Sequence, residues 1–290
     1  SYPVAINRHP CCISCLLVSI KRINRMTTDS SPVVIGGSGG SGTRMIALSC
    51  KVAGYDLGAR LNDSYDALDF AKFYDDWVNP YLLGSSSAMP PEQTYKMRRE
   101  FDACLSRFMS SIKDPGQWGF KNPRSMLVLP FLDSVFSALR FVHVVRDGRD
   151  MAYSKNQHQL EKHGDAVSTP EDQRLSPPEQ SIAFWSRTNM LVARYGEEVM
   201  GGRYFRCRFE DLCREPEASL KRLADFLRAE IENPQQVIDR LIVPKSIGRW
   251  KEAAADDRAQ LAKIGHTGLE YFGYLGAGSD DPGAAASDRG

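Results

Sequence analysis

A glycine-rich loop that joins an apolar run to a helical pattern constrains the fold of this chain most strongly. Residues 32–35 (PVVI) are apolar and mostly β-branched, residues 36–42 read GGSGGSG, and residues 43–52 have helical character. Glycine lets the backbone turn sharply and aim several N–H groups inward, and the start of a helix adds positive potential. The sequence therefore predicts a strand, an anion-binding loop and a helix, with a phosphate or a sulfate as the natural anion.

Three interpretations of this loop compete. A flexible Gly/Ser linker has a similar composition, although its position between a strand and a helix argues against a linker. Gly37, Gly39 and Gly42 satisfy the G-x-G-x-x-G pattern of dinucleotide-binding proteins, which alone has little specificity. Gly37 and Gly42 also have Walker A spacing, but Thr43 stands at the lysine position and Arg44 follows it. The loop indicates a phosphate without defining its carrier.

The remaining pattern is one of alternating strands and helices. Further strands are predicted at 141–145 and 204–209, and helices at 125–139, 149–160, 179–197 and 216–230. Such alternation predicts a single α/β domain over residues 31–275, with a central, mainly parallel sheet flanked by helices and ligands at the carboxyl ends of its strands. Residues 1–30, 165–178 and 276–290 have compositions typical of unstructured segments.

Charge and cysteine content exclude several classes of protein. Basic residues number 37 and acidic residues 36, so no overall field favours a nucleic acid or a membrane surface. The seven scattered cysteines indicate neither a disulfide framework nor a zinc site, and a cytoplasmic, reducing location fits them best. The apolar run Cys11–Ile20 is too short to span a bilayer, although it keeps a membrane-anchored or lumenal location as the alternative.

A second anion site is predicted where the strand 141–145 ends. This strand delivers Arg146 at its carboxyl end, and Ser154 follows eight residues later, about two turns into the predicted helix. A guanidinium fork and a hydroxyl could contact one phosphate from these positions. The alternative is that Arg146 and Arg149 only pair with Asp147 and Asp150 on a solvated turn.

At this point the chain resembles the PAPS-dependent sulfotransferases, which have a P-loop-like fold. Residues 146–154 (RDGRDMAYS) fit the R-[DN]-x-[KR]-D-x-x-x-S pattern of their 3′-phosphate site, and residues 41–43 resemble the S-G-T core of their 5′-phosphosulfate loop. Residues 209–212 (FEDL) resemble a Y-E-D-L segment whose aromatic ring stacks on adenine, and residues 248–251 (GRWK) resemble a late basic segment over the 3′-phosphate. The resemblance spans residues 32–275 and implies PAPS contacts from Gly39, Gly40, Ser41, Gly42, Thr43, Arg44, Arg146, Ser154, Phe209, Arg249, Trp250 and Lys251.

One position departs from the family pattern. Many members have Lys or Arg immediately before S-G-T, to neutralise the leaving group, whereas this chain has Gly40. Lys121 is the predicted replacement, because residues 121–123 (KNP) resemble the K-x-P lysine of tyrosine-sulfating and related enzymes; an exposed loop lysine is the alternative. Arg44 and Arg124 are the second choices.

An acceptor hydroxyl also needs a general base. Tyrosine-sulfating relatives have a glutamate about twenty residues past the loop, and by this resemblance Asp63 is the first candidate and Asp66 the second. Asp63 could equally cap a helix that begins near Tyr65. His143, inside an apolar strand, is expected to be a core residue rather than a base.

The predicted function is transfer of the PAPS sulfuryl group to an acceptor hydroxyl or amine by in-line displacement, which releases adenosine 3′,5′-bisphosphate (PAP) and demands no metal. A P-loop kinase, a nicotinamide-binding protein and a catalytically silent nucleotide-binding relative are the alternatives. The acceptor is a small molecule, a carbohydrate or a peptide rather than a nucleic acid. The sequence defines neither which of these it is nor an oligomeric state.

Overall fold

The computed structural model describes residues 31–84, 89–241 and 243–275. Within them, one parallel sheet has the order β2-β1-β3-β4, and its strands are β1 (Val33–Gly37), β2 (Gly119–Lys121), β3 (Arg140–Val145) and β4 (Tyr204–Arg208). The predicted α/β domain with a central parallel sheet is confirmed. The N-terminal and C-terminal segments predicted to be unstructured, and the run Cys11–Ile20, lie outside the described residues.

Helices connect the strands and cover both faces of the sheet. The α-helices are α2 (Thr43–Val52), α3 (Ala71–Gly84), α4 (Pro91–Met109), α5 (Leu129–Val135), α6 (Gly148–Ala152), α7 (His158–Val167), α8 (Pro177–Tyr195), α9 (Phe209–Arg214), α10 (Pro216–Leu227), α11 (Pro234–Ile238), α12 (Ala255–Ile264) and α13 (His266–Tyr271). Shorter helical turns are η1 (Leu68–Phe70), η2 (Pro123–Val128), η3 (Asp172–Arg174), η4 (Gly196–Met200), η5 (Gly201–Arg203) and η6 (Arg249–Glu252). None of these helices is long and apolar enough to cross a bilayer.

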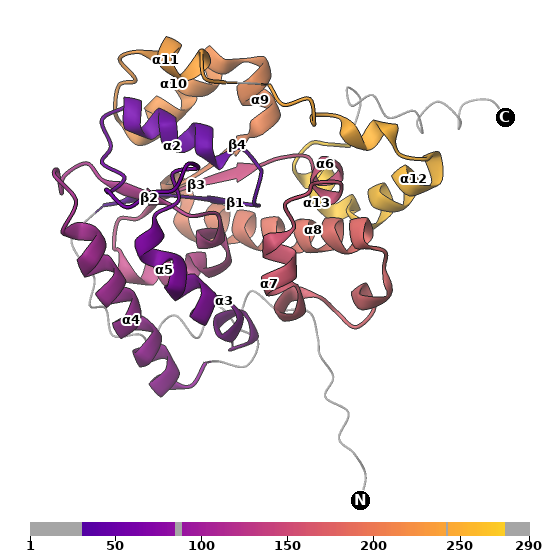
Figure 1. Ribbon diagram of the computed structural model, residues 1–290, viewed down its shortest axis with the longest axis horizontal. Helices are drawn as coiled ribbons and strands as arrows, with labels where there is room; N and C mark the ends of the chain where they lie inside the picture. Colours follow the sequence, from indigo (N-terminus) through magenta and orange to yellow (C-terminus); the bar gives the residue numbers. More distant parts are fainter. Residues whose placement is uncertain (1–30, 85–88, 242, 276–290) are drawn as a thin grey trace, which may run out of the picture.

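Alternating side chains of β1 pack into two of the hydrophobic clusters of the fold. Val33 and Ile35 of β1 pack with residues of α2 and α10, whereas Val34 packs with residues of α3, α4 and α5. Figure 1 shows these two layers, with α2, α10 and α11 on one side of the sheet and α3, α4, α5 and α8 on the other. The second layer is rich in stacked and edge-on rings, including those of Phe70 and Phe73, so these aromatic side chains belong to the core.

Two local predictions were wrong, and one strand had not been predicted. Strand β2 was missed, because Gly-Phe-Lys is short and contains no β-branched residue. The predicted helix 149–160 is two helices, α6 and α7, since the side chains of Ser154 and Asn156 accept hydrogen bonds from backbone N–H groups two residues later. The polar segment 165–178 is ordered rather than unstructured, because it contains the end of α7, the turn η3 and the start of α8.

His143 is a core residue, as predicted. Its Nδ1 lies 2.7 Å from the Tyr204 hydroxyl and its Nε2 lies 2.9 Å from Asn189 Oδ1, and the side chain is fully buried. Burial lowers the pKa of the imidazole from 6.5 to about 3. The native chain therefore keeps His143 neutral, whereas the unfolded chain protonates it below its ordinary pKa.

We predict that His143 makes the fold sensitive to mild acid. Its contribution is fully present above pH 6.5 and falls by about 1.4 kcal/mol for each pH unit below that value, because the unfolded state binds one more proton. Urea unfolding between pH 7 and pH 4 measures this slope. The His143→Gln variant should show a shallower slope and the exposed control His266→Gln the wild-type slope; equal slopes in all three proteins would contradict the prediction.

Candidate functional site

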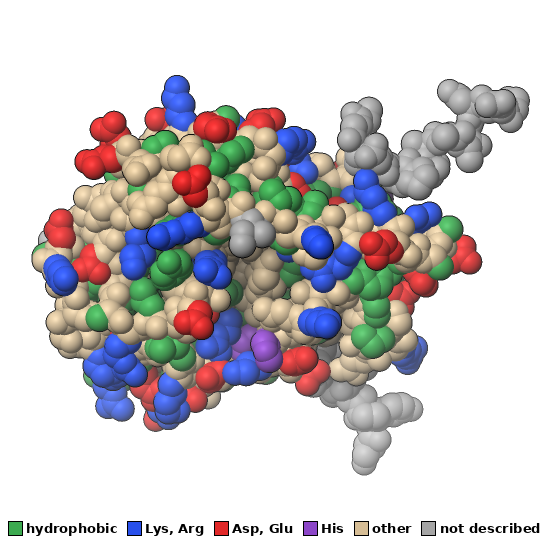
Figure 2. Space-filling model, turned by 45° about the horizontal axis from the view of Figure 1, so that its top comes forward, with side chains coloured by type: hydrophobic (Ala, Val, Ile, Leu, Met, Phe, Trp, Pro, Cys, Tyr) green, Lys and Arg blue, Asp and Glu red, His purple; other side chains and the backbone are tan. Residues whose placement is uncertain are grey.

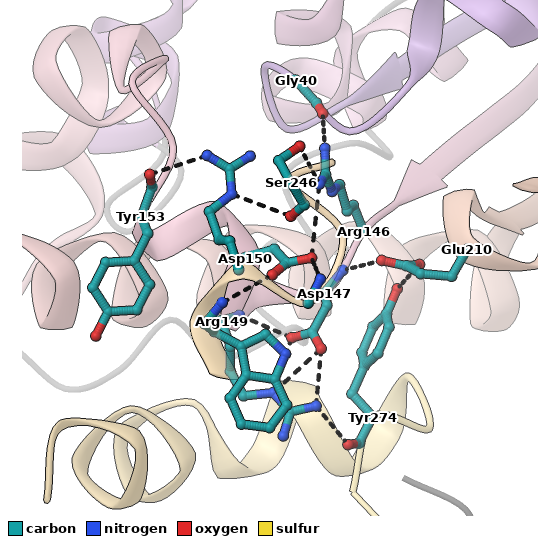
Figure 3. A network of polar contacts seen from close by, with 12 residues as sticks. Gly40, Arg146, Asp147, Arg149, Asp150, Tyr153, Glu210, Ser246 and Tyr274 are labelled. Carbon is teal, nitrogen blue, oxygen red and sulfur yellow. Dashed lines mark hydrogen bonds and ion pairs between the residues drawn. The ribbon is translucent and has the colours of Figure 1, made fainter. Parts of the chain in front are cut away.

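The carboxyl edge of the sheet brings the two predicted anion sites together. Gly37 at the end of β1 lies opposite Val144 near the end of β3, so the glycine loop and Arg146 leave the sheet side by side. Arg146 Nη1 donates to the carbonyl oxygen of Gly40 at 3.3 Å (Figure 3). The face seen in Figure 2 is hollowed between its two halves, with lysine and arginine side chains along the hollow.

The loop adopts a conformation that explains two of its glycines. Gly40 and Gly42 have φ angles of 90° and 94°, in the left-handed region that residues with a Cβ rarely adopt. A Cβ at Gly42 would also lie 2.1 Å from a ring carbon of Phe209, whereas a Cβ at Gly40 would meet nothing closer than 3.6 Å. Gly40 therefore replaces the family's cation where backbone conformation, rather than space, favours glycine.

The second half of the loop has the features of an anion cradle. Thr43 begins α2, so the N–H groups of Thr43 and Arg44 face the loop ahead of the first hydrogen bond of this helix, in which the N–H of Met45 donates to the carbonyl oxygen of Gly42 at 2.9 Å. Among the described residues, Ser41 Oγ is one of few buried side-chain atoms without a hydrogen-bond partner. Because an unpaired buried hydroxyl is costly, a bound anion would stabilise this arrangement.

Arg146 is held in place by the protein but keeps donor capacity. The side chain is 4% exposed, its Nη2 donates to Ser246 Oγ at 2.9 Å, and its Nε is buried without a partner among the described residues. Ser154 lies beside Gly40, since a Cβ on this glycine would be 3.9 Å from Ser154 Oγ. Ser154 follows α6 in the connector to α7, and not two turns into one helix as predicted. The structure thus brings Arg146 and Ser154 to the same loop.

Asp150 holds the late basic segment, residues 248–251, next to Arg146. Asp150 accepts hydrogen bonds from the backbone N–H groups of Gly248 at 2.8 Å and Trp250 at 3.3 Å, and its Oδ2 lies 3.7 Å from Arg146 Nη2. The pKa of Arg249 is lowered, first by burial and then by the positive charge of Arg146. The guanidinium groups of Arg146 and Arg249 are therefore close enough to repel each other, and an anion between them would relieve this repulsion.

Other members of the charged motif have structural partners. Arg149 pairs with Asp147 at 2.8 Å, donates to the carbonyl oxygen of Tyr274 and lies 3.7 Å over the ring of Trp250. The N–H of Asp147 donates in turn to Glu210 (Figure 3). The alternative of a solvated turn is wrong, since Arg146, Asp147, Arg149 and Asp150 are all at most 7% exposed.

The two predicted aromatic contacts are buried. Phe209 starts α9, is 4% exposed and packs between Gly42 and the Arg146 guanidinium, which lies 5.5 Å from the ring centre. Trp250 is 5% exposed beneath Arg149, and Lys251 is exposed beside it. Stacking of Phe209 on an adenine stays a prediction.

Lys121 and Asp66 form a pair at the end of β2. Lys121 is 2% exposed, so the alternative of an exposed loop lysine is wrong, and its Nζ lies 2.5 Å from Asp66 Oδ1 and 3.0 Å from the carbonyl oxygen of Ser64. Burial lowers the pKa of Lys121, the Asp66 carboxylate opposes this shift, and the charge of Arg44 adds to it. Since Arg44 lies in the first turn of α2, the pair of Lys121 and Asp66 is near the end of the glycine loop where this helix begins.

The remaining candidates are placed differently. Asp63 is exposed in a turn, and the first helical turn after it begins at Leu68 rather than near Tyr65, so the helix-cap alternative is wrong. Arg44 is exposed in the first turn of α2. Arg124 pairs with Asp75 at 2.5 Å and anchors α3. Within the described residues, no group of histidine, cysteine, aspartate or glutamate side chains is arranged to hold a metal ion.

Gln159 is a residue that the sequence analysis missed. It lies in the first turn of α7, its Oε1 accepts from the N–H of Gly39 at 3.2 Å, and its Nε2 donates to the carbonyl oxygen of Gly37 at 3.2 Å. A glutamine in a helix has no distinctive pattern, and the partners are more than a hundred residues away, so no sequence signal identifies this contact.

Comparison with known proteins agrees with this arrangement. The sequence model described as "Sulfotransferase family" matches residues 59–233, so the chain belongs to the sulfotransferase family. The match includes Lys121, Arg146 and Ser154, whereas the glycine loop and the late basic segment lie outside it. No curated protein sequence matches this chain.

Solved sulfotransferase structures share the fold at low sequence identity. The sulfotransferase domain from the Synechococcus PCC 7002 olefin synthase has a TM-score of 0.53 at 15% identity, over 88% of this chain and 98% of that one. The sulfotransferase domain from the curacin biosynthetic pathway has a TM-score of 0.51 at 14% identity, over 87% and 99%. Sulfotransferase STF9 from Mycobacterium avium has a TM-score of 0.53 at 12% identity, over 85% and 78%.

We predict that Asp66 keeps Lys121 in its buried position. In Asp66→Asn the ammonium loses its ion-pair partner while it remains desolvated, so the free energy of unfolding should fall by about 1–3 kcal/mol in urea at pH 7. The control is Asp76→Asn, which breaks the exposed pair with Lys72 and should change stability little. Equal effects of the two substitutions would show that the Lys121 pair contributes no more than a surface pair.

Proposed function

We propose that this chain transfers the sulfuryl group of PAPS to a hydroxyl or amine of an acceptor and releases PAP. The observation that carries the proposal is the buried Arg146 guanidinium, which contacts the glycine loop at Gly40 and whose Nε has no hydrogen-bond partner within the described ranges. A donor with phosphates on both its 3′ and 5′ positions needs two anion sites within one nucleotide length. Membership of the sulfotransferase family supports the reaction class.

In this proposal, the two anion sites bind opposite ends of the donor. Arg146, Ser154 and Arg249 would bind the 3′-phosphate, since they share the corner next to Gly40. The loop amides, Ser41 and the start of α2 would bind the 5′-phosphosulfate. Asp150 is a positioning residue in this proposal, because it holds the Gly248–Trp250 backbone against the 3′-phosphate corner.

In the transfer step, the acceptor oxygen or nitrogen attacks sulfur as the bond from sulfur to the bridging oxygen breaks. PAP leaves with the electron pair of that bond, and Lys121 would stabilise the developing charge in place of the cation missing at Gly40. A carboxylate takes the acceptor proton. Asp66 is favoured over Asp63 for this role, because Asp66 contacts Lys121 whereas Asp63 lies in an exposed turn.

The 3′-phosphate site predicts a selective loss of affinity in Arg146→Ala. By calorimetry, the Kd for PAP should rise about 30- to 100-fold, equivalent to about 2–3 kcal/mol, because a charge-assisted contact is lost. The Kd for 5′-AMP, which lacks the 3′-phosphate, should change much less. Arg214→Ala, an exposed arginine paired with Asp211, is the control and should bind PAP as the wild type does. Equal losses for both nucleotides would remove Arg146 from the 3′-phosphate site.

Lys121→Ala is expected to separate chemistry from binding. Transfer from labelled PAPS to a panel of phenol, sugar and peptide acceptors should slow about 10²–10³-fold in kcat, while the Kd for PAP stays within a few-fold. Lys72→Ala, an exposed lysine on α3, should keep the wild-type rate. Unchanged turnover in Lys121→Ala would remove this lysine from the mechanism. PAP binding by a wild-type chain without any transfer would indicate a catalytically silent relative.

A thermal-shift comparison separates the proposal from its alternatives. A ligand at 100 times its Kd stabilises the native state by about 2.7 kcal/mol. PAP should raise the midpoint at lower concentration than ATP or NAD. A larger shift with ATP would favour a kinase, and one with NAD a nicotinamide-binding protein.

A further inference from the structure

The first half of the glycine loop is tied to a helix on which the donor proposal does not depend. Gln159 bridges the loop through both ends of its amide, which accepts from the N–H of Gly39 and donates to the carbonyl oxygen of Gly37. Nearby, Ser38 Oγ accepts from the amide of Asn189, which also contacts His143 of β3. Residues 37–39 are thus held at successive positions by side chains of other elements.

Helix α7 is itself anchored to α3 near its middle, so Gln159 connects the loop to a helix that is held in place. Lys162 Nζ lies 2.7 Å from Asp75 Oδ1, and His163 Nδ1 lies 2.7 Å from Asn79 Oδ1. Asn79 also donates to the carbonyl oxygen of Lys162 at 2.8 Å. Because Asp75 and Asn79 both belong to α3, α7 cannot shift without breaking these contacts.

The glycine content of the loop explains why the hydrogen bonds of Gln159 would matter for ligand affinity. Glycine loses more conformational freedom on ordering than any other residue, and most of residues 36–42 are glycine. A ligand that had to order this loop would bind more weakly by that cost. The side-chain amide of Gln159 satisfies one donor and one acceptor of the loop before any ligand is present, and it leaves the N–H groups of Thr43 and Arg44 at the start of α2 to a ligand.

We propose that Gln159 is a positioning residue that orders the glycine loop for the donor without contacting the reacting atoms. This inference rests on the proposed function for its effect on PAP, but the ordering itself does not. Removal of the bridge leaves the fold intact and makes the loop mobile, so that part of the binding free energy of the donor is spent on ordering it.

The test is hydrogen–deuterium exchange of residues 36–42 in wild type, Gln159→Met and Gln159→Glu, combined with calorimetry of PAP. Met has a similar length and cannot form either hydrogen bond, whereas Glu keeps the acceptor for Gly39 but turns an oxygen toward the Gly37 carbonyl. Without ligand, exchange of the loop should accelerate at least several-fold in both variants, and the Kd for PAP should rise roughly tenfold. Saturating PAP should bring the loop back to wild-type protection.

The matched control is Gln180→Met, which removes a half-buried glutamine in the first turn of α8 whose side chain donates to the carbonyl oxygen of Leu175, just before this helix. Its loop exchange and PAP affinity should equal those of the wild type at a similar melting temperature. Unchanged loop exchange in both Gln159 variants overturns the inference. Faster exchange together with a wild-type protein that does not bind PAP keeps the ordering role and overturns the donor assignment instead.

Discussion

The pairing of β1 with β3 as adjacent parallel strands is the constraint on which the site depends. Parallel neighbours end at the same edge, so the loop after Gly37 and the arginine after Val145 leave the sheet together although more than a hundred residues separate them. The hydrogen bond from Arg146 to Gly40 is the direct result. A sheet order that separated these strands would place the two proposed anion sites apart.

The charges of the Arg146–Asp150 segment are buried at a cost that the rest of the fold offsets. Asp147 is neutralised by Arg149, and Asp150 accepts two backbone hydrogen bonds while burial raises the pKa of its carboxyl group. Glu210 and Tyr274 extend the same network. Arg146 retains an unpaired Nε within this network, which suits a residue whose full complement of partners includes a ligand.

The sequence was sufficient for the fold class and for placing the glycine loop next to Arg146, because both follow from strongly patterned strands with a loop or an arginine at their ends. It was insufficient wherever a long-range contact decides the outcome. Strand β2 exists because it pairs with β1, and not because of its own residues. Lys121 and Asp66 were singled out by resemblance, whereas their pairing depends on a turn with Tyr65 at a φ of 64°. Gln159 has no local signature at all.

A crystal structure of the chain with PAP tests the central claim most directly. The account predicts the 3′-phosphate against Arg146 and Ser154 and the 5′-phosphate against the N–H groups of residues 42–44, with one nucleotide spanning both. A nucleotide bound at the carboxyl edge with its 3′-phosphate turned away from Arg146, or bound elsewhere on the chain, would contradict it.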